Sequence, residues 1–130
     1  MTTPSPMSGF SHVQLHVSDV ARSERWYSTV LGLERLTASD DGSYVALRHG
    51  PSKVVIVLSA AGDRVLGDSG ALDHLAFGVP DGPTLEKWAT ALRGCGIDHS
   101  GVVDELGKPS LVLTDPDGNS VELVAPPGSW

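Results

Sequence analysis

Polar and apolar residues alternate along two short segments of the chain, and a helical pattern follows each of them. One side of the first segment is apolar and the other polar, with Val13, Leu15 and Val17 opposite His12, Gln14 and His16. The second segment repeats the alternation, with Leu75, Phe77 and Val79 opposite His74, Ala76 and Gly78. Both segments are therefore predicted to be strands that pack one face on a helix and leave the other face open.

A helix is predicted directly after each of these strands. Asp19 and Asp81 stand where N-caps are expected, and Gly32 and Gly94 stand where a left-handed residue ends a helix. The second helix has an apolar stripe at positions i, i+3, i+4 and i+7, made by Leu85, Trp88, Ala89 and Leu92. Trp26 and Trp88 are interpreted as core residues between helix and sheet.

The chain contains an internal repeat. Residues 10–32 align without gaps on residues 72–94, an offset of 62 positions. Six aligned pairs are identical: His12/His74, Val17/Val79, Asp19/Asp81, Glu24/Glu86, Trp26/Trp88 and Gly32/Gly94. This period is too long for a solenoid repeat and indicates two copies of one supersecondary module.

Three more short strands are expected after each helix. They lie at about 34–38, 44–48 and 53–58 in the first copy and at about 97–104, 110–114 and 120–124 in the second. A type I turn at Asp115-Pro116-Asp117-Gly118 joins the last pair. The predicted fold class is α+β, with two βαβββ modules in tandem forming a cupped mixed sheet and both helices on its outer face.

The expected domain organisation is simple. Residues 10–126 form a single domain, with module one at about 10–60 and module two at about 72–125. Residues 1–9, rich in Ser, Thr and Pro, are expected to be a disordered lead, and residues 127–130 a short C-terminal tail.

Composition and charge exclude several classes of function. The net charge is −7 and the nine Lys and Arg residues are scattered, which argues against a nucleic-acid partner. No apolar run approaches the roughly 20 residues of a membrane span, and the N-terminus lacks the features of a signal peptide. The single Cys95 fits a reducing compartment, so a cytoplasmic location is expected.

Three side chains that can bind a metal are predicted to share the open face. In the last strand Val121 and Leu123 take the apolar side, which turns Glu122 toward the side of His12 and His74. Each of the three alone would be typical of a solvated surface. Together, two imidazoles and one carboxylate are the donor set of a divalent-metal site with open positions.

Four further residues are candidates for substrate or second-shell contacts. Gln14 and His16 share the predicted open face, although His16 could simply be exposed near the strand end. Tyr44 and Arg48 share one face of a later strand; if that face is the open one, Arg48 could hold an anionic group and Tyr44 a ring. No catalytic acid or base is identified.

The stretches HVQLHVSDVARSERWYSTVLGLE, LDHLAFGV and LTDPDGNSVELV resemble the vicinal oxygen chelate superfamily over about residues 10–125. That superfamily includes glyoxalase I, fosfomycin resistance proteins, extradiol dioxygenases, methylmalonyl-CoA epimerase and bleomycin-binding resistance proteins. The resemblance implies one divalent metal ion per site, held by His12, His74 and Glu122. It also implies a homodimer in which His12 of one chain joins His74 and Glu122 of the other.

Departures from the family pattern narrow the choice of reaction. Glyoxalase I and the epimerase take a fourth ligand from the last strand of the first module, where this chain has the apolar Ile56 and Val57. The basic residues of the fosfomycin resistance proteins are missing after Glu122, and only Lys108 is near. Val112 stands where the extradiol dioxygenases have a tyrosine. His99 is a loose candidate for their acid–base histidine, but a solvated loop residue is the simpler interpretation. The bleomycin-binding members lack the metal ligands that this chain keeps.

The leading expectation is a divalent-metal-dependent enzyme that binds a small oxygenated substrate through two adjacent oxygens. Lyase, isomerase, addition or transfer, and ring-cleaving dioxygenase chemistry all stay open, as does the choice between Fe, Mn, Zn and Ni. The alternative is a non-catalytic dimeric protein that binds a small molecule or sequesters an antibiotic, and a third possibility is an inactive scaffold that retains the ligands.

Overall fold

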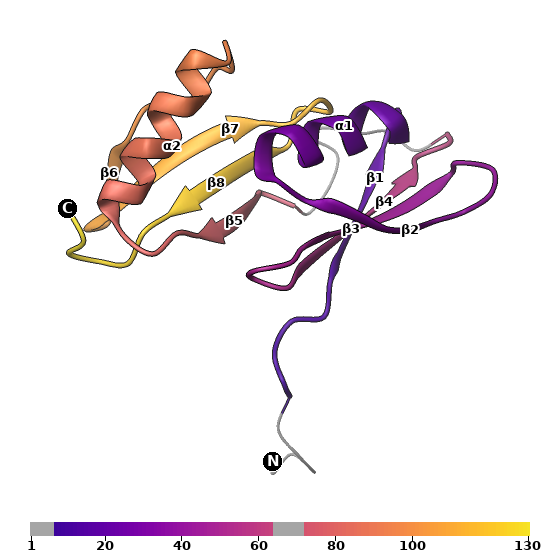
Figure 1. The fold of residues 1–130 in the computed structure, drawn as a ribbon, viewed down its shortest axis with the longest axis horizontal. Coiled ribbons are helices and arrows are strands. Elements are labelled where there is room, and N and C mark those ends of the chain that lie inside the picture. The colour runs from indigo at the N-terminus through magenta and orange to yellow at the C-terminus, as the bar shows by residue number, and fades with distance from the viewer. Residues whose placement is uncertain (1–6, 64–71) are drawn as a thin grey trace. The chain divides into compact units, whose positions relative to one another are not determined.

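The structure, a computed structural model, describes residues 7–63 and 72–130. Residues 1–6 of the predicted disordered lead lie outside the described residues. The chain divides into two compact units between Ala61 and Gly62, and each unit contains one helix and four strands (Figure 1).

The two units have the same order of elements. The first contains β1 (Val13–Val17), α1 (Val20–Leu31), β2 (Glu34–Ala38), β3 (Tyr44–His49) and β4 (Val54–Ala60). The second contains β5 (His74–Gly78), α2 (Gly82–Gly94), β6 (Val103–Glu105), β7 (Lys108–Thr114) and β8 (Ser120–Val124). This order confirms the predicted α+β class with two βαβββ modules.

Each module forms its own four-stranded mixed sheet. The strand orders are β1-β4-β3-β2 and β5-β8-β7-β6, so the first strand of a module lies beside its last. That pair is parallel in both modules, and the other neighbours are antiparallel. The repeat in sequence is therefore a repeat in topology as well.

The alternation of apolar and polar residues places one face of each sheet under its helix. In β1, Leu15 and Val17 are buried while Gln14 and His16 are exposed. The same parity holds in β5, where Leu75 and Phe77 are half-buried and His74 is exposed. Helix α1 contacts β3 and β4, and α2 contacts β7. The face opposite each helix carries the candidate site residues.

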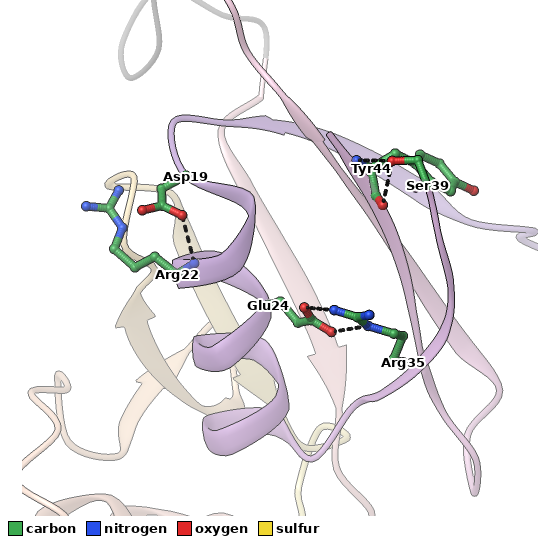
Figure 2. Close-up of polar contacts among 6 residues, drawn as sticks. All are labelled: Asp19, Arg22, Glu24, Arg35, Ser39 and Tyr44. Carbon is green, nitrogen blue, oxygen red and sulfur yellow. Dashed lines mark hydrogen bonds and ion pairs between the residues drawn. The ribbon is translucent and has the colours of Figure 1, made fainter. Parts of the chain in front are cut away.

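Capping explains where the helices begin. The Asp19 carboxylate accepts a hydrogen bond from the backbone N–H of Arg22 at 3.0 Å (Figure 2), and Asp81 caps α2 in the same way through Thr84. Helix α1 ends at the predicted residue, because Gly32 has a φ of 76° that a residue with a side chain rarely adopts.

The predicted end of α2 is wrong by two residues. Gly94 is the last helical residue, and the left-handed position is Gly96, with a φ of 70°. With Gly96 in the left-handed conformation, the N–H of Ile97 donates to the carbonyl oxygen of Leu92 at 2.9 Å. This hydrogen bond completes a C-terminal capping motif, which would not form if the helix ended at a left-handed Gly94.

Two other expectations need correction. The strand predicted at 97–104 is reduced to β6 (Val103–Glu105), because glycines at 96 and 101 take left-handed conformations and interrupt an extended chain. Trp26 and Trp88, predicted to be core residues, are only half-buried. In α1 the buried aromatic residue is instead the neighbouring Tyr27, whose ring meets that of Trp26 edge to face at 4.9 Å.

An ion pair fastens α1 to β2. Arg35 donates from Nε and Nη2 to the two carboxylate oxygens of Glu24, at 2.7 and 2.6 Å (Figure 2). Because both oxygens are engaged by one planar guanidinium, the helix and strand are held in one relative orientation.

The C-terminal tail is tied to the second module at two points. Gly82, the first residue of α2, donates its N–H to the carbonyl oxygen of Ser129 at 2.9 Å, and Gly128 donates to Gly107 at 3.2 Å. Across the described parts of the chain, no helix has the length and apolar character needed to cross a bilayer.

Candidate metal centre

The second module brings His74 and Glu122 together. The parallel register places His74 opposite Ser120 and Ala76 opposite Glu122, so the first strand and the last strand point both side chains to the open face. Nε2 of His74 lies 3.4 Å from Oε2 of Glu122. The ring's other nitrogen, Nδ1, lies 2.7 Å from a carboxylate oxygen of Asp73. Asp73 therefore holds the ring so that Nε2 faces the carboxylate.

The hydrogen bond that the Asp73 carboxylate accepts from the ring also raises the pKa of His74, because a carboxylate stabilises the imidazolium form. Metal sites commonly contain such an imidazole. One of its nitrogens is hydrogen-bonded to a carboxylate, and this contact orients the other nitrogen toward the metal position. Asp73 was not among the predicted site residues, although its position next to His74 was a usable signal.

Glu122 is a buried carboxylate with an acidic neighbour. It is 6% exposed, and this burial raises its pKa, with a further contribution from a side-chain hydrogen bond to Glu105. The same hydrogen bond lowers the pKa of Glu105. Burial and the neighbouring Glu105 carboxyl therefore both disfavour the ionised form of Glu122.

His12 lies in the first module, one residue before β1 begins at Val13. It is exposed, and its Nδ1 lies 2.8 Å from the hydroxyl of Ser11. This leaves Nε2 as the nitrogen that could bind a metal ion. His12 thus occupies the position in module one that His74 occupies in module two, but it precedes the strand instead of starting it.

The other four candidate residues share the open face of the first sheet. Gln14 pairs with Val57 and His16 with Ser59 in the parallel register, while Tyr44 is opposite Ser59 and Arg48 is opposite Val55. Ser59, which the sequence analysis missed, connects two of them: its hydroxyl accepts from Nε2 of Gln14 at 3.2 Å and lies 3.1 Å from Nδ1 of His16. Tyr44 and Arg48 are half-buried on the same face.

Three positions at which the family's enzymes were expected to differ, Val57, Val112 and His99, can be located in the structure. In β4, Val57 faces the open side opposite Gln14, so this position of that face is apolar. Val112 lies opposite Glu122 on β7. His99 lies in the loop before β6, where its Nδ1 accepts a hydrogen bond from the N–H of Gly101 at 2.9 Å.

As the side chains stand, neither residues 7–63 nor residues 72–130 contain by themselves three His, Cys, Asp or Glu groups gathered so that they could hold a metal ion. Within the second module, the His74–Glu122 pair supplies two donors with suitable chemistry for a divalent cation: an imidazole nitrogen and a carboxylate whose burial makes an unpaired negative charge unfavourable.

Comparison with solved structures places the chain in a known fold. A glyoxylase/bleomycin resistance protein/dioxygenase domain from Frankia sp. EAN1pec superposes with a TM-score of 0.78 at 26% identity, with 96% of each chain covered. A lactoylglutathione lyase from Agrobacterium tumefaciens gives 0.77 at 24% identity, covering 93% of this chain and 96% of the other. A fosfomycin resistance protein from Listeria monocytogenes gives 0.71 at 15% identity, covering 93% and 95%, which is a likeness of fold alone.

Among curated proteins, no sequence matches the chain. The family model of the Glyoxalase/Bleomycin resistance protein/Dioxygenase superfamily, however, matches residues 9–123, which is nearly all of the two modules. The chain therefore belongs to the Glyoxalase/Bleomycin resistance protein/Dioxygenase superfamily, the vicinal oxygen chelate proteins.

Proposed function

We propose that this protein is a divalent-metal-dependent enzyme that acts on a small molecule with two adjacent oxygen atoms. The observation that carries the proposal is the His74–Glu122 pair, with Nε2 and Oε2 at 3.4 Å and with Nδ1 of the imidazole held by Asp73. Family membership and the neighbouring lactoylglutathione lyase fold support an enzymatic role.

His74 and Glu122 are two of the proposed ligands. Asp73 fixes the imidazole so that its free nitrogen faces Glu122, and the buried carboxylate gains a positive partner when a cation binds. A divalent ion held there would act as a Lewis acid toward the chelating oxygens of the substrate. Fe, Mn, Zn and Ni are all compatible with this donor pair.

His12 is the proposed third ligand, supplied from the equivalent position of the first module. We favour a homodimer in which His12 of one chain completes the site formed by His74 and Glu122 of the other. The exposure of His12 and the free Nε2 left by its contact with Ser11 support this role.

The open face of the first sheet is the proposed substrate surface. Arg48 would bind an anionic group, and Tyr44 would contact a ring or chain of the substrate. Gln14 and His16 are joined through Ser59, so this trio offers a fixed set of hydrogen-bonding groups. Loss of activity in Arg48→Ala with metal content retained would support the role of Arg48, and unchanged kinetics would contradict it.

The cellular setting is expected to be the cytoplasm. Cys95, the single cysteine of the chain, is an exposed free thiol, which suits a reducing compartment.

Elemental analysis of protein purified without a metal-affinity tag tests the proposal. The natural chain is expected to carry one divalent ion per chain, and a His74→Ala, Glu122→Ala double variant is expected to carry none while remaining folded. A matched double variant, His49→Ala with Glu86→Ala, removes the same residue types elsewhere and should keep the ion. Equal metal content in all three proteins would refute the assignment.

Mixing two inactive variants tests whether the site is shared. A dimer of one His12→Ala chain and one His74→Ala chain contains one intact site if His12 acts across the interface, and none if all ligands come from one chain. Recovery of metal binding on mixing would therefore establish the shared site, whereas no recovery from a mixed dimer would place the ligands within one chain.

The second candidate function is a binding protein without chemistry. It is favoured by the finding that neither described module alone gathers three metal-binding side chains. Such a protein would bind its small molecule stoichiometrically and without metal even after anaerobic reconstitution with each ion.

A further inference from the structure

The surface of the second module has an open depression where α2 ends. It has a volume of about 400 Å³, and we call it the helix-end pocket. Ligand-binding pockets usually measure roughly 300–1,000 Å³, so the helix-end pocket is large enough for a small molecule. The residues that line it are Arg93, Gly96, Ile97, Asp98, His99 and Gly101.

The loop that forms one wall of the helix-end pocket is held at both ends. At its start, the N–H of Ile97 donates to the carbonyl oxygen of Leu92 at 2.9 Å. At its end, Ser100 exchanges two hydrogen bonds with Val112 of β7: its N–H donates to the carbonyl oxygen at 3.0 Å, and its hydroxyl accepts from the N–H at 2.9 Å. Because this backbone is already fixed, little conformational freedom is lost when a ligand binds.

The imidazole of His99 is oriented by its own loop. Its Nδ1 accepts a hydrogen bond from the N–H of Gly101 at 2.9 Å, and Gly101 has a left-handed φ of 76°. A ring nitrogen that accepts a hydrogen bond carries no proton, so the ring proton lies on Nε2. His99 therefore supplies an N–H donor to a ligand in the helix-end pocket.

The helix-end pocket has side chains of both charges. Arg93 belongs to the last turn of α2 and Asp98 to the loop that follows, and both are exposed. Within residues 7–63 and 72–130, neither side chain makes an ion pair or a hydrogen bond. Both charges are therefore available to a ligand.

These two charges indicate the class of ligand. A simple anion on Arg93 would be repelled by the Asp98 carboxylate and by the negative end of the α2 dipole. A simple cation on Asp98 would be repelled by Arg93. A free α-amino acid carries one charge of each sign on a single carbon atom, so it can form a charge-assisted hydrogen bond with each side chain.

We propose that the helix-end pocket is a binding site for a free α-amino acid with an apolar side chain. Arg93 and Nε2 of His99 would bind the carboxylate, and Asp98 would bind the ammonium group. Ile97 is half-buried in the pocket wall and offers apolar surface to the ligand's side chain. The site uses none of the proposed metal ligands, so it does not depend on the proposed function.

NMR titration of the full-length protein tests the inference with three probes of one shape. L-leucine carries both charged groups, L-leucinamide lacks the carboxylate, and 4-methylpentanoate lacks the ammonium group. L-leucine is expected to shift the backbone amide signals of residues 93–101 in a saturable manner. Each of the other two probes should bind at least about tenfold more weakly, because each loses one hydrogen bond between charged groups.

Two variants test which side chain binds which group. Arg93→Gln should weaken L-leucine at least about tenfold, and so should Asp98→Asn. The matched controls are Lys87→Gln and Glu86→Gln, which remove the same charges from exposed residues of α2 outside the helix-end pocket and should stay within about twofold of the natural chain. Circular dichroism should show that all of these proteins are folded.

Three results would overturn the inference. The first is that L-leucine leaves the signals of residues 93–101 unchanged. The second is equal binding of L-leucine and either truncated probe, which would show that the pocket does not recognise both charged groups. The third is equal affinity for L-leucine in Arg93→Gln and Lys87→Gln, or in Asp98→Asn and Glu86→Gln, since the effect would then come from net charge.

Discussion

The N–H of Gly82 and the carbonyl oxygen of Ser129 are joined by a 2.9 Å hydrogen bond that fastens the start of α2 to the C-terminal tail. The two backbones are so close that a Cβ atom at position 82 would lie 2.3 Å from that oxygen. Gly82→Ala must therefore displace the tail or the helix start. We expect a loss of about 1–3 kcal/mol in the free energy of unfolding, measured by chemical denaturation.

Gly94→Ala is the control for this substitution. Gly94 is helical, and a Cβ atom there would meet no other atom within 4 Å. Alanine should be neutral or should stabilise the chain by up to about 1 kcal/mol, because it favours helix over glycine. Equal unfolding midpoints for the two variants would show that the tail does not stabilise the helix start.

The Glu24–Arg35 ion pair should make a small, pH-dependent contribution to stability. The Arg35 hydrogen bonds hold the pKa of Glu24 below its usual value of 4.5. A lowered pKa means that the stabilisation is present above that value and is lost as the pH falls through the lower value of the folded state. Because the Arg35 side chain is 58% exposed and solvent screens its charge, we expect only a small coupling energy from a double-mutant cycle of Glu24→Gln and Arg35→Gln at neutral pH. The coupling energy should vanish in strong acid; a value that does not change with pH would contradict an ionic origin.

Asp41 should remain ionised in acid far below the usual range. The turn between β2 and β3 surrounds one of its oxygens with hydrogen bonds from the hydroxyl and N–H of Ser43 and the hydroxyl of Ser39, at 2.7, 3.0 and 2.9 Å. The Ser43 hydroxyl is the largest cause that lowers the pKa of Asp41 from 3.8 to about 2. The stabilisation of the turn is thus present above pH 3.8 and is lost as the pH falls through about 2.

Carboxyl carbon NMR measures this titration directly. Ser43→Ala should move the midpoint of Asp41 upward, and Ser43→Thr, which keeps the hydroxyl, should leave it low. An Asp41 midpoint near 3.8 in the natural chain would show that the turn is not formed in solution.

Asp73 should increase the affinity for metal by holding the His74 ring. Asp73→Ala removes the acceptor at Nδ1, and we expect about tenfold weaker binding, the low end for such an effect because Asp73 itself is exposed. The titration should be repeated at several pH values, because Asp73 also raises the pKa of that imidazole and a proton competes with the ion for it. Asp98→Ala removes an equal charge from an exposed loop of the same module and should leave the affinity unchanged. A loss in both variants would indicate a general charge effect.

Alternation and capping residues were sufficient to predict the fold. The parity that puts Gln14 and His16 opposite Leu15 holds in the structure, as do the start and end of α1 at Asp19 and Gly32. These features are local, so the residues of a single strand or helix end are sufficient to predict them. The end of α2 is different: Gly94 and Gly96 are both acceptable, and a backbone hydrogen bond from Ile97 decides between them.

The candidate site could be predicted only in part for a related reason. His74 and Glu122 follow from strand parity and from the repeat, but Glu105 lies in a strand of three residues, too short to show alternation. Its electrostatic effect on Glu122 depends on the strand order β8-β7-β6, which brings residues distant in sequence into one sheet. Ser59 was missed because a serine at the end of the apolar run of β4 gives no signal until His16 is known to lie opposite it.

The pairing of each module's first strand with its last has a consequence for how the protein is made. During synthesis β1 leaves the ribosome early but finds its neighbour only when β4 has followed, and the same delay separates β5 from β8. The proposed metal ligands of the second module lie on these two late-pairing strands, His74 on β5 and Glu122 on β8. In a chain that has not yet added β8, His74 is therefore present without Glu122 beside it. The proposed ion could bind only after the last strand has paired.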